Sequence, residues 1–245
     1  MTQRYPVTEQ VEGVFVVNKP QGPTSHDMVD HLRRRLGIRR IGHAGTLDPI
    51  AEGVLVTLVG RATRRQREVQ TYPKQYETLI RLGVQTDTGD AWGQTVSTAP
   101  VPVLDRGQLE ELLRSMTGPL LQTPPPFSAV KVRGRPLYWW TRHGMPQAVS
   151  PRRVEIFQIV LLEAAEQTMR CRIDCSSGTY VRTLAEVIAQ RLGTVGHVAQ
   201  LTRLAVGPWT LETAHPLSWI LNADLDQLRA ALQPFSAVHA RHSRP

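Results

Sequence analysis

Apolar positions recur at intervals of three and four in three stretches of the chain, which is the spacing of amphipathic helices. The first predicted helix covers residues 24–37, with Thr24 or Ser25 as its N-cap and a glycine at its end. The second covers 104–118, and the third covers 178–193. The apolar faces are expected to be Met28, Val29, Leu32 and Leu36, then Leu109, Leu112, Leu113 and Met116, then Val181, Leu184, Ile188 and Leu192.

Other stretches are short and apolar or alternate between apolar and polar residues, which predicts strands. In residues 75–82, alternation places Tyr76, Thr78, Ile80 and Leu82 on one face. The predicted strands come in runs rather than alternating regularly with helices, which favours a mixed α+β sheet domain over a doubly wound one. The further strands are expected at 13–19, 53–60, 152–164, 167–178 and 197–209.

Residues 123–153 fit neither pattern, because they hold six prolines, several aromatic residues and no acid. They are too long for a passive loop and predict an ordered insertion, of about 122–153, that leaves the sheet and touches a ligand. After residue 213 only one short helical pattern remains, followed by a polar tail at 236–245 that is expected to fray.

The chain has neither an apolar N-terminal segment typical of a secretory signal nor an apolar run long enough to span a membrane, so a cytoplasmic protein is expected.

Charge is distributed unevenly along this basic chain, whose formal net charge is +8. Residues 33–67 contain nine arginines and two acids, and residues 112–154 contain seven basic residues and no acid. Such segregation favours a surface that binds a polyanion, most often nucleic acid, although solubility alone remains an alternative.

The two cysteines predict no chemistry of their own. Cys171 and Cys175 are three residues apart, which matches neither a four-cysteine zinc site nor a redox pair. Strand alternation places both on one face with Ile173, as small buried apolar residues. The histidines are scattered, so neither a metal nor another cofactor is expected.

The stretch GHAGTLDPIAEGVL, residues 42–55, places Asp48 in a region rich in arginine. Several roles stay open for it: a turn residue, a partner of His43 in a metal site, a member of a Ser-His-Asp triad, or a neighbour of a phosphate cradle at Gly42 and Gly45. No phosphate-loop or nucleophile-elbow motif supports these chemical alternatives. A carboxylate kept ionised by a nearby cation can attack a sugar carbon or accept a proton without any cofactor.

The same stretch resembles the catalytic motif of the bacterial tRNA pseudouridine-55 synthases, the TruB family. Four further segments resemble motifs of that family, in the family's order, over about residues 12–209. They are GVFVVNKPQGPTSHD, KQYETLIRLGVQTDTGDAWG, PPPFSAVKVRGRPLYWWTRHG and CSSGTYVRTLAEVIAQRLG with HVAQLTRLAVGPW. The family commonly has alanine where Thr141 stands and an acidic turn where AEVIAQ follows Leu184, but neither departure affects a proposed catalytic residue.

The resemblance implies a role for each matching residue. Asp48 would be the catalytic aspartate, Tyr76 the tyrosine that stacks on the target base, and Arg182 the arginine that pairs with the aspartate. In the substrate-binding set, His43 would fill the gap that the uridine leaves in the T loop, and Leu201 would line the pocket. The same set includes Tyr180 and Lys19, which with Pro20 forms a structural pair beneath the site. Its remaining members come from the acid-free basic segment 112–154, which predicts the main RNA contacts at Lys131, Arg133, Arg135 and Arg142. Trp139 and Trp140 are expected mainly to pack.

The resemblance also implies the fold and the activity. The fold would be a mixed, largely antiparallel sheet with flanking helices, within a catalytic domain at 10–213. A short extension at 214–245 would follow, with a PUA-like RNA-binding domain absent or vestigial. The implied activity is conversion of uridine 55 in the tRNA T loop to pseudouridine by a monomer without metal or cofactor. A non-catalytic tRNA-binding or RNA-folding protein, and a phosphate-handling hydrolase, are the alternatives.

Overall fold

The computed structural model describes residues 11–103 and 105–235. The N-terminal segment, which was interpreted as lacking a secretory signal, lies outside these ranges. The polar tail at 236–245, for which fraying was predicted, also lies outside them. The chain forms two compact units, unit 1 up to Tyr72 and from Arg203 onward, and unit 2 from Pro73 to Thr202. Within the described ranges, no helix is long and apolar enough to cross a membrane.

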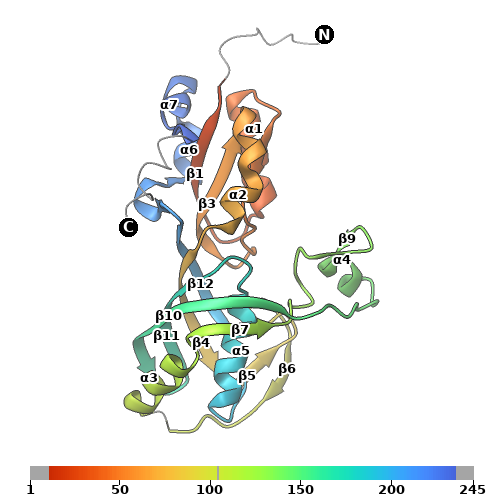
Figure 1. Ribbon diagram of the computed structural model, residues 1–245, viewed down its shortest axis with the longest axis vertical. Helices are drawn as coiled ribbons and strands as arrows, with labels where there is room; N and C mark the ends of the chain where they lie inside the picture. The colour runs from red at the N-terminus through yellow and green to blue at the C-terminus, as the bar shows by residue number, and fades with distance from the viewer. Residues whose placement is uncertain (1–10, 104, 236–245) are drawn as a thin grey trace. The chain divides into compact units, whose positions relative to one another are not determined.

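Unit 1 is built on the antiparallel pair β1 (Gly13–Lys19) and β3 (Glu52–Val59), to which β2 (Ile41–His43) adds antiparallel and β14 (His215–Pro216) adds parallel. Both central strands are almost wholly buried, as continuous apolar runs predict. Figure 1 shows α1 beside these strands. The other elements of unit 1 are α1 (Ser25–Leu36), η1 (Gly60–Arg65), α2 (Gln66–Thr71), β13 (Trp209–Thr210), η2 (Leu211–Thr213), α6 (Leu217–Asn222) and α7 (Leu225–Ala230).

Helix α1 confirms the helix predicted at 24–37. Thr24 is its N-cap, in a capping box with Asp27, and Gly37 ends it with φ 68°. The predicted apolar face is buried. Ser25 has a different task, because its Oγ donates to the Leu47 carbonyl at 3.0 Å and accepts from the Leu47 amide at 2.8 Å.

Unit 2 contains a sheet with the strand order β12, β4, β11, β10, β7. The pairings of β4 with β11, β11 with β10 and β10 with β7 are all antiparallel. The predicted face of β4 is buried from Tyr76 to Leu82. The bounds are β4 (Lys74–Leu82), β5 (Val84–Thr86), β6 (Thr95–Thr98), α3 (Arg106–Ser115), β7 (Gly118–Gln122), β10 (Arg152–Ala165), β11 (Thr168–Cys175), α5 (Val181–Arg191) and β12 (Gly196–Val206), the last of which continues into unit 1.

The two cysteines occupy the buried face of β11, as predicted. Cys171 and Cys175 have no exposed surface, and burial raises the pKa of their thiols to about 12 and about 11. Both thiols are therefore protonated and inert at neutral pH.

Helices α3 and α5 confirm the other two predicted helices. Asp105 is the N-cap of α3, and its side chain accepts a hydrogen bond from the Gln108 amide. Leu112 and Leu192 are only half-buried, at the edges of the predicted faces. Together with the mixed strand pairing, these helices confirm the α+β fold class.

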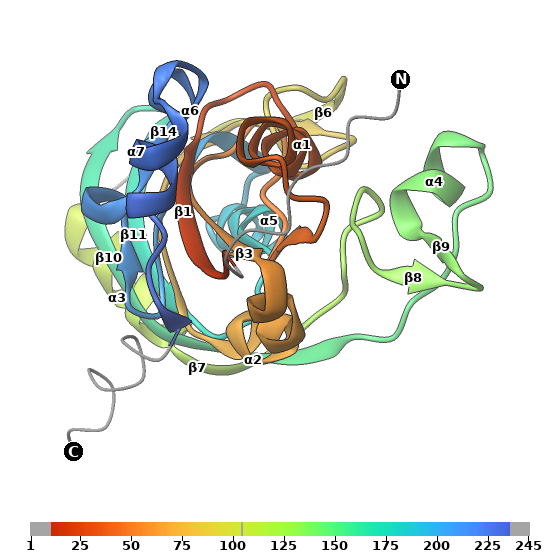
Figure 2. The same cartoon turned by 90° about the horizontal axis from the view of Figure 1, so that it is seen from above.

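The insertion at 122–153 leaves the sheet and returns to it at one point, because Gln122 at the end of β7 pairs with Arg152 at the start of β10. Between them lie β8 (Lys131–Val132), β9 (Arg135–Pro136) and α4 (Leu137–Arg142). Figure 2 shows these three elements together, away from β7 and β10.

Between residues 214 and 235, the described part of the C-terminal segment holds the two short helices α6 and α7, where the sequence pattern predicted one. Ala223 is extended, with ψ 143°, and Asp224 then caps α7 in a capping box with Gln227. The new cap interrupts the helical pattern and starts a second helix.

Candidate active site

Asp48 lies in the loop between β2 and β3, and hydrogen bonds from neighbouring segments fix this loop. The Ser25 hydroxyl is bonded to both backbone groups of Leu47, and the Gly22 amide donates to the Pro49 carbonyl at 2.9 Å. The Ala51 amide donates to the Asp48 carbonyl at 3.0 Å, which closes a tight turn. The Asp48 side chain is half-buried, so it combines a fixed backbone with access to a ligand.

Lys19 lies at the end of β1 and has no exposed surface. Its Nζ donates to the carbonyls of Pro20 and Pro23, each at 2.9 Å. Burial lowers the pKa of Lys19 to about 8, although the nearby Asp48 carboxylate acts in the opposite direction. These contacts support the structural role predicted for Lys19 and Pro20, whereas binding of substrate by Lys19 stays a prediction.

His43 ends β2 and is half-buried. Burial, and then the positive charge of Arg203, lower the pKa of His43 below its usual value, so the imidazole is neutral at physiological pH. The Gln66 side-chain amide holds the His43 carbonyl at 3.0 Å. Unit 1 therefore brings Lys19, His43 and Asp48 into one region.

Arg203 was not predicted as a functional residue, yet it is a buried cation that contacts this loop. It is 1% exposed and donates to three carbonyls of the segment that carries Asp48. The sequence offered one signal, a charged residue within an apolar strand pattern, and it was not used.

Tyr76 and Leu201 lie on the neighbouring strands β4 and β12 of unit 2. They are 9% and 7% exposed, and the Thr78 hydroxyl donates to the Gln200 carbonyl between the same two strands at 2.9 Å. An aromatic ring and an aliphatic side chain on a rigid sheet can form an apolar surface for a base. Contact of either residue with a base stays a prediction.

Arg182, near the start of α5, is 4% exposed and firmly held. Its Nη1 and Nη2 donate to the carbonyls of Thr88 and Phe127 at 2.7 and 2.8 Å, and its Nε lies 4.0 Å from Asp90 Oδ2. Asp90 in turn accepts hydrogen bonds from the Thr88 hydroxyl and the Trp92 amide. No role was predicted for Asp90 from the sequence.

The predicted pairing of Arg182 with Asp48 joins residues of different units and stays a prediction. Within unit 2, Tyr180 precedes α5, and its backbone is held by Gln122. The Gln122 side chain accepts from the Tyr180 amide at 2.9 Å and donates to the Tyr180 carbonyl at 3.3 Å. The root of the insertion is thereby fixed to the start of the helix that carries Arg182.

The four basic residues predicted in the insertion are all exposed: Lys131, Arg133, Arg135 and Arg142. The Arg135 guanidinium lies over the Trp139 ring, 4.1 Å from its centroid, and Trp140 Nε1 donates to the Val132 carbonyl at 3.0 Å. Trp139 and Trp140 are half-buried and meet edge to face. The tryptophans therefore pack, as predicted, and the cations face outward.

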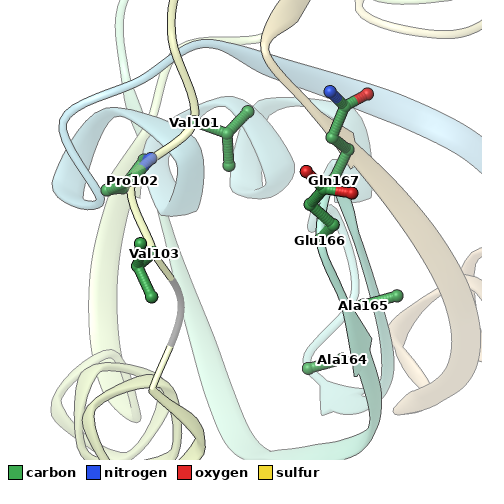
Figure 3. A pocket seen from close by; sticks show the side chains of 7 residues that line it. All are labelled: Val101, Pro102, Val103, Ala164, Ala165, Glu166 and Gln167. Atoms are coloured by element: carbon green, nitrogen blue, oxygen red, sulfur yellow. The ribbon is translucent and has the colours of Figure 1, made fainter.

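A cavity of about 430 Å³ lies elsewhere in unit 2, between residues 101–103 and the turn that joins β10 and β11 (Figure 3). None of the site residues proposed from the sequence lines it. In the described ranges, no group of three or more His, Cys, Asp or Glu side chains could hold a metal ion.

The fold is that of the pseudouridine synthases. The structure is similar to the crystal structure of a Cbf5-Nop10-Gar1 complex, with a TM-score of 0.69 and 27% identity over 92% of this chain. It is also similar to an H/ACA RNP bound to a substrate RNA containing 2'-deoxyuridine, with a TM-score of 0.66, 25% identity and coverage of 91% of this chain. The chain spans 60% of the length of the first of these matched chains and 59% of the length of the second.

Residues 33–181 match the family model described as TruB family pseudouridylate synthase, N-terminal domain. The chain is 44% identical over 209 residues to the tRNA pseudouridine synthase B of Geobacillus kaustophilus (strain HTA426). This match covers 82% of this chain and 73% of the relative. It is 40% identical over 226 residues to the enzyme of the same name from Opitutus terrae, covering 92% of this chain and 94% of that relative. The chain therefore belongs to the TruB family of pseudouridylate synthases, as the sequence motifs indicated.

Proposed function

We propose that this enzyme converts uridine 55 in the T loop of tRNA to pseudouridine. The observation that carries the proposal is the extensive sequence identity to proteins named tRNA pseudouridine synthase B. The loop that holds Asp48, whose backbone is fixed by Ser25, is consistent with it. The substrate is a single uridine, and the reaction is an isomerisation. The bond between C1′ and N1 breaks, a bond between C1′ and C5 forms, and the proton on C5 leaves while N1 gains one.

Asp48 is the reacting group in this proposal. As a carboxylate it either attacks the sugar or removes a proton from it, and both routes require the ionised form on a fixed backbone. The neighbouring cation of Lys19 favours that form, because an opposite charge stabilises a carboxylate. The fixed turn around Leu47 and Pro49 holds the carboxyl in place for either route.

Tyr76 and Leu201 supply the surface for the flipped base, and Arg182 supplies a positive charge at the start of α5. His43, a neutral and half-buried ring, has the size and polarity to occupy the space that a flipped nucleotide leaves. Unstacking one base costs a few kcal/mol, about what such aromatic and polar contacts return.

The RNA surface in this proposal is the insertion, whose exposed Lys131, Arg133, Arg135 and Arg142 would follow the phosphates of the T arm. The enzyme would act as a monomer in the cytoplasm, where its tRNA substrate is made. It would need neither metal nor cofactor, because the reaction is redox-neutral.

The test is incubation with an unmodified tRNA transcript whose uridines carry tritium at C5. Because C5 loses its hydrogen when it bonds to C1′, each turnover releases one tritium atom into water. We expect release of one tritium per tRNA and a pseudouridine mapped to position 55, with no release from a transcript that carries cytidine there. Tight binding without release would instead favour the alternative of a non-catalytic tRNA-binding protein.

A further inference from the structure

Arg203 contacts both ends of the segment that carries Asp48. Its Nη2 and Nη1 donate to the carbonyls of Gly45 and Thr46 at 3.1 and 3.4 Å, and its Nε donates to the Val54 carbonyl at 2.7 Å. Three donors of one planar group thus hold the segment before Asp48 and the strand after it. Only a guanidinium presents such a fork of donors, whereas an ammonium is a point charge.

Two glycines of the motif lie against residue 203, one against its backbone and one beside its side chain. A Cβ on Gly53 would lie 2.3 Å from the Arg203 carbonyl oxygen, so the two backbones can approach only if residue 53 is glycine. Gly45 has φ +102°, in the region that favours glycine, and this conformation accompanies the hydrogen bond from its carbonyl to Arg203. Gly53 therefore lets the two strands approach whatever side chain residue 203 carries, whereas Gly45 lies beside the Arg203 guanidinium itself.

The charge of Arg203 also acts on the site. Burial is the largest cause of the lowered pKa of Lys19 and of His43, and the charge of Arg203 lowers both further, while the Asp48 carboxylate acts in the opposite direction on Lys19. Lys19 is therefore an electrostatic neighbour of both Arg203 and Asp48 in unit 1. Burying the arginine is costly, and its three hydrogen bonds to backbone carbonyls offset that cost. An apolar residue at 203 would avoid the cost, but it would leave these carbonyls without this partner.

We propose that Arg203 is the positioning residue of the reaction, a buried cationic clamp that fixes the Asp48 loop in its reactive geometry. This inference rests on the proposed function for its kinetic part. In this proposal Arg203 does not contact the substrate, and it acts through the backbone on either side of Asp48. A displacement of a reacting group by about 1 Å can cost about a hundredfold in rate, so a clamp of this kind affects turnover more than binding.

The test compares Arg203→Lys with the wild-type enzyme and with Leu32→Ala. Leu32 is fully buried in α1 of the same unit and lies outside the Asp48 loop, so its variant controls for general destabilisation. Three quantities are measured: the single-turnover rate at saturating T-arm RNA, the RNA dissociation constant, and hydrogen exchange of peptides that cover residues 44–54.

We expect Arg203→Lys to lower the rate by at least about tenfold while the dissociation constant changes less than about threefold, and to speed exchange within 44–54. Leu32→Ala should keep its rate within about threefold of the wild type. A rate for Arg203→Lys within that same range, or a loss no larger than that of Leu32→Ala, would overturn the proposal.

Two further results keep the test decisive. If Arg203→Lys does not fold, Gly45→Ala disturbs the same contact from the loop side, and a wild-type rate in that variant would contradict the clamp. If the wild-type enzyme forms no pseudouridine, the proposed function fails, while unchanged exchange at 44–54 in Arg203→Lys would separately refute the clamp.

Discussion

Asp48 is the residue on which the proposed chemistry depends. Asp48→Asn keeps the shape of the side chain and removes its charge, so turnover should fall below about 1% of the wild-type rate while tRNA affinity stays within about twofold. The measurement is tritium release in a single turnover, together with filter binding of the same tRNA. Turnover of the variant at a tenth of the normal rate would show that Asp48 is not the catalyst.

Arg182 should be equally intolerant of a conservative change. Its guanidinium bonds two carbonyls and lies near Asp90 in one fixed arrangement, which a lysine cannot reproduce. We expect both Arg182→Ala and Arg182→Lys to reduce kcat by about a hundredfold or more, with a smaller change in KM. Full recovery of kcat in the lysine variant would indicate that only the charge matters. Asp90→Asn is the companion variant, expected to reduce kcat because it weakens the hold on Arg182.

Lys19 gives unit 1 a dependence on pH. Its folded-state pKa of about 8 lies below the ordinary value of 10.5, so between these values the unfolded chain binds more protons than the folded one. Folding stability should therefore rise with pH across this window, by roughly 2 kcal/mol between pH 7 and pH 9.5. The measurement is the free energy of unfolding in urea at both pH values, relative to Lys19→Met. The buried cysteines oppose this trend in both proteins and cancel in the difference.

At the scale of elements, apolar periodicity sufficed to predict a helix or strand wherever one face of the element is buried. It predicted α1, α3, α5 and the buried face of β4, because burial of a face imposes its period on the sequence. It failed where a local cap divides a pattern. The helical pattern after residue 213 became two helices, because Asp224 provides a second N-cap. Likewise the final strand pattern breaks at Gly207, with φ 52°, into β12 and β13.

The insertion is the element to which we assign most of the RNA contact. Replacing Arg133, Arg135 and Arg142 with Gln should weaken tRNA binding and reduce the slope of log affinity against log salt by roughly 0.7–0.9 for each lost phosphate contact. Turnover at saturating RNA should change little, since these residues position the substrate. The measurement is affinity over a range of salt concentrations, with single-turnover rates alongside.

A matched control removes the same charge from ion-paired positions. Arg106, Arg170 and Arg172 lie within 4 Å of Glu110, Glu77 or Glu163, and their replacement with Gln should leave the slope almost unchanged. An unchanged slope in the insertion variant would move the RNA surface to the other basic region, Arg33–Arg67.

At the scale of the molecule, motifs identified the family, but contacts between distant segments could not be inferred from a single sequence. Arg203 contacts carbonyls about 150 residues earlier in the chain, with separations of 149, 157 and 158 for its three hydrogen bonds. Asp90 and Arg182 are likewise brought together only by folding. The three acceptors of Arg203 are backbone groups, which carry no mark in the sequence, so side-chain patterns alone could not show them.

The proposed reaction requires no metal, and the whole enzyme should therefore tolerate exhaustive chelation. The bonds that break and form belong to one nucleotide, no electrons are gained or lost, and Asp48 supplies the reactive group. Magnesium does stabilise folded tRNA, so the substrate should be a short T-arm stem-loop that folds without it. We expect the same single-turnover rate in EDTA as in magnesium, measured by tritium release at one ionic strength. If EDTA abolished turnover on the stem-loop and a stoichiometric amount of one metal restored it, the chemistry would have to include that metal.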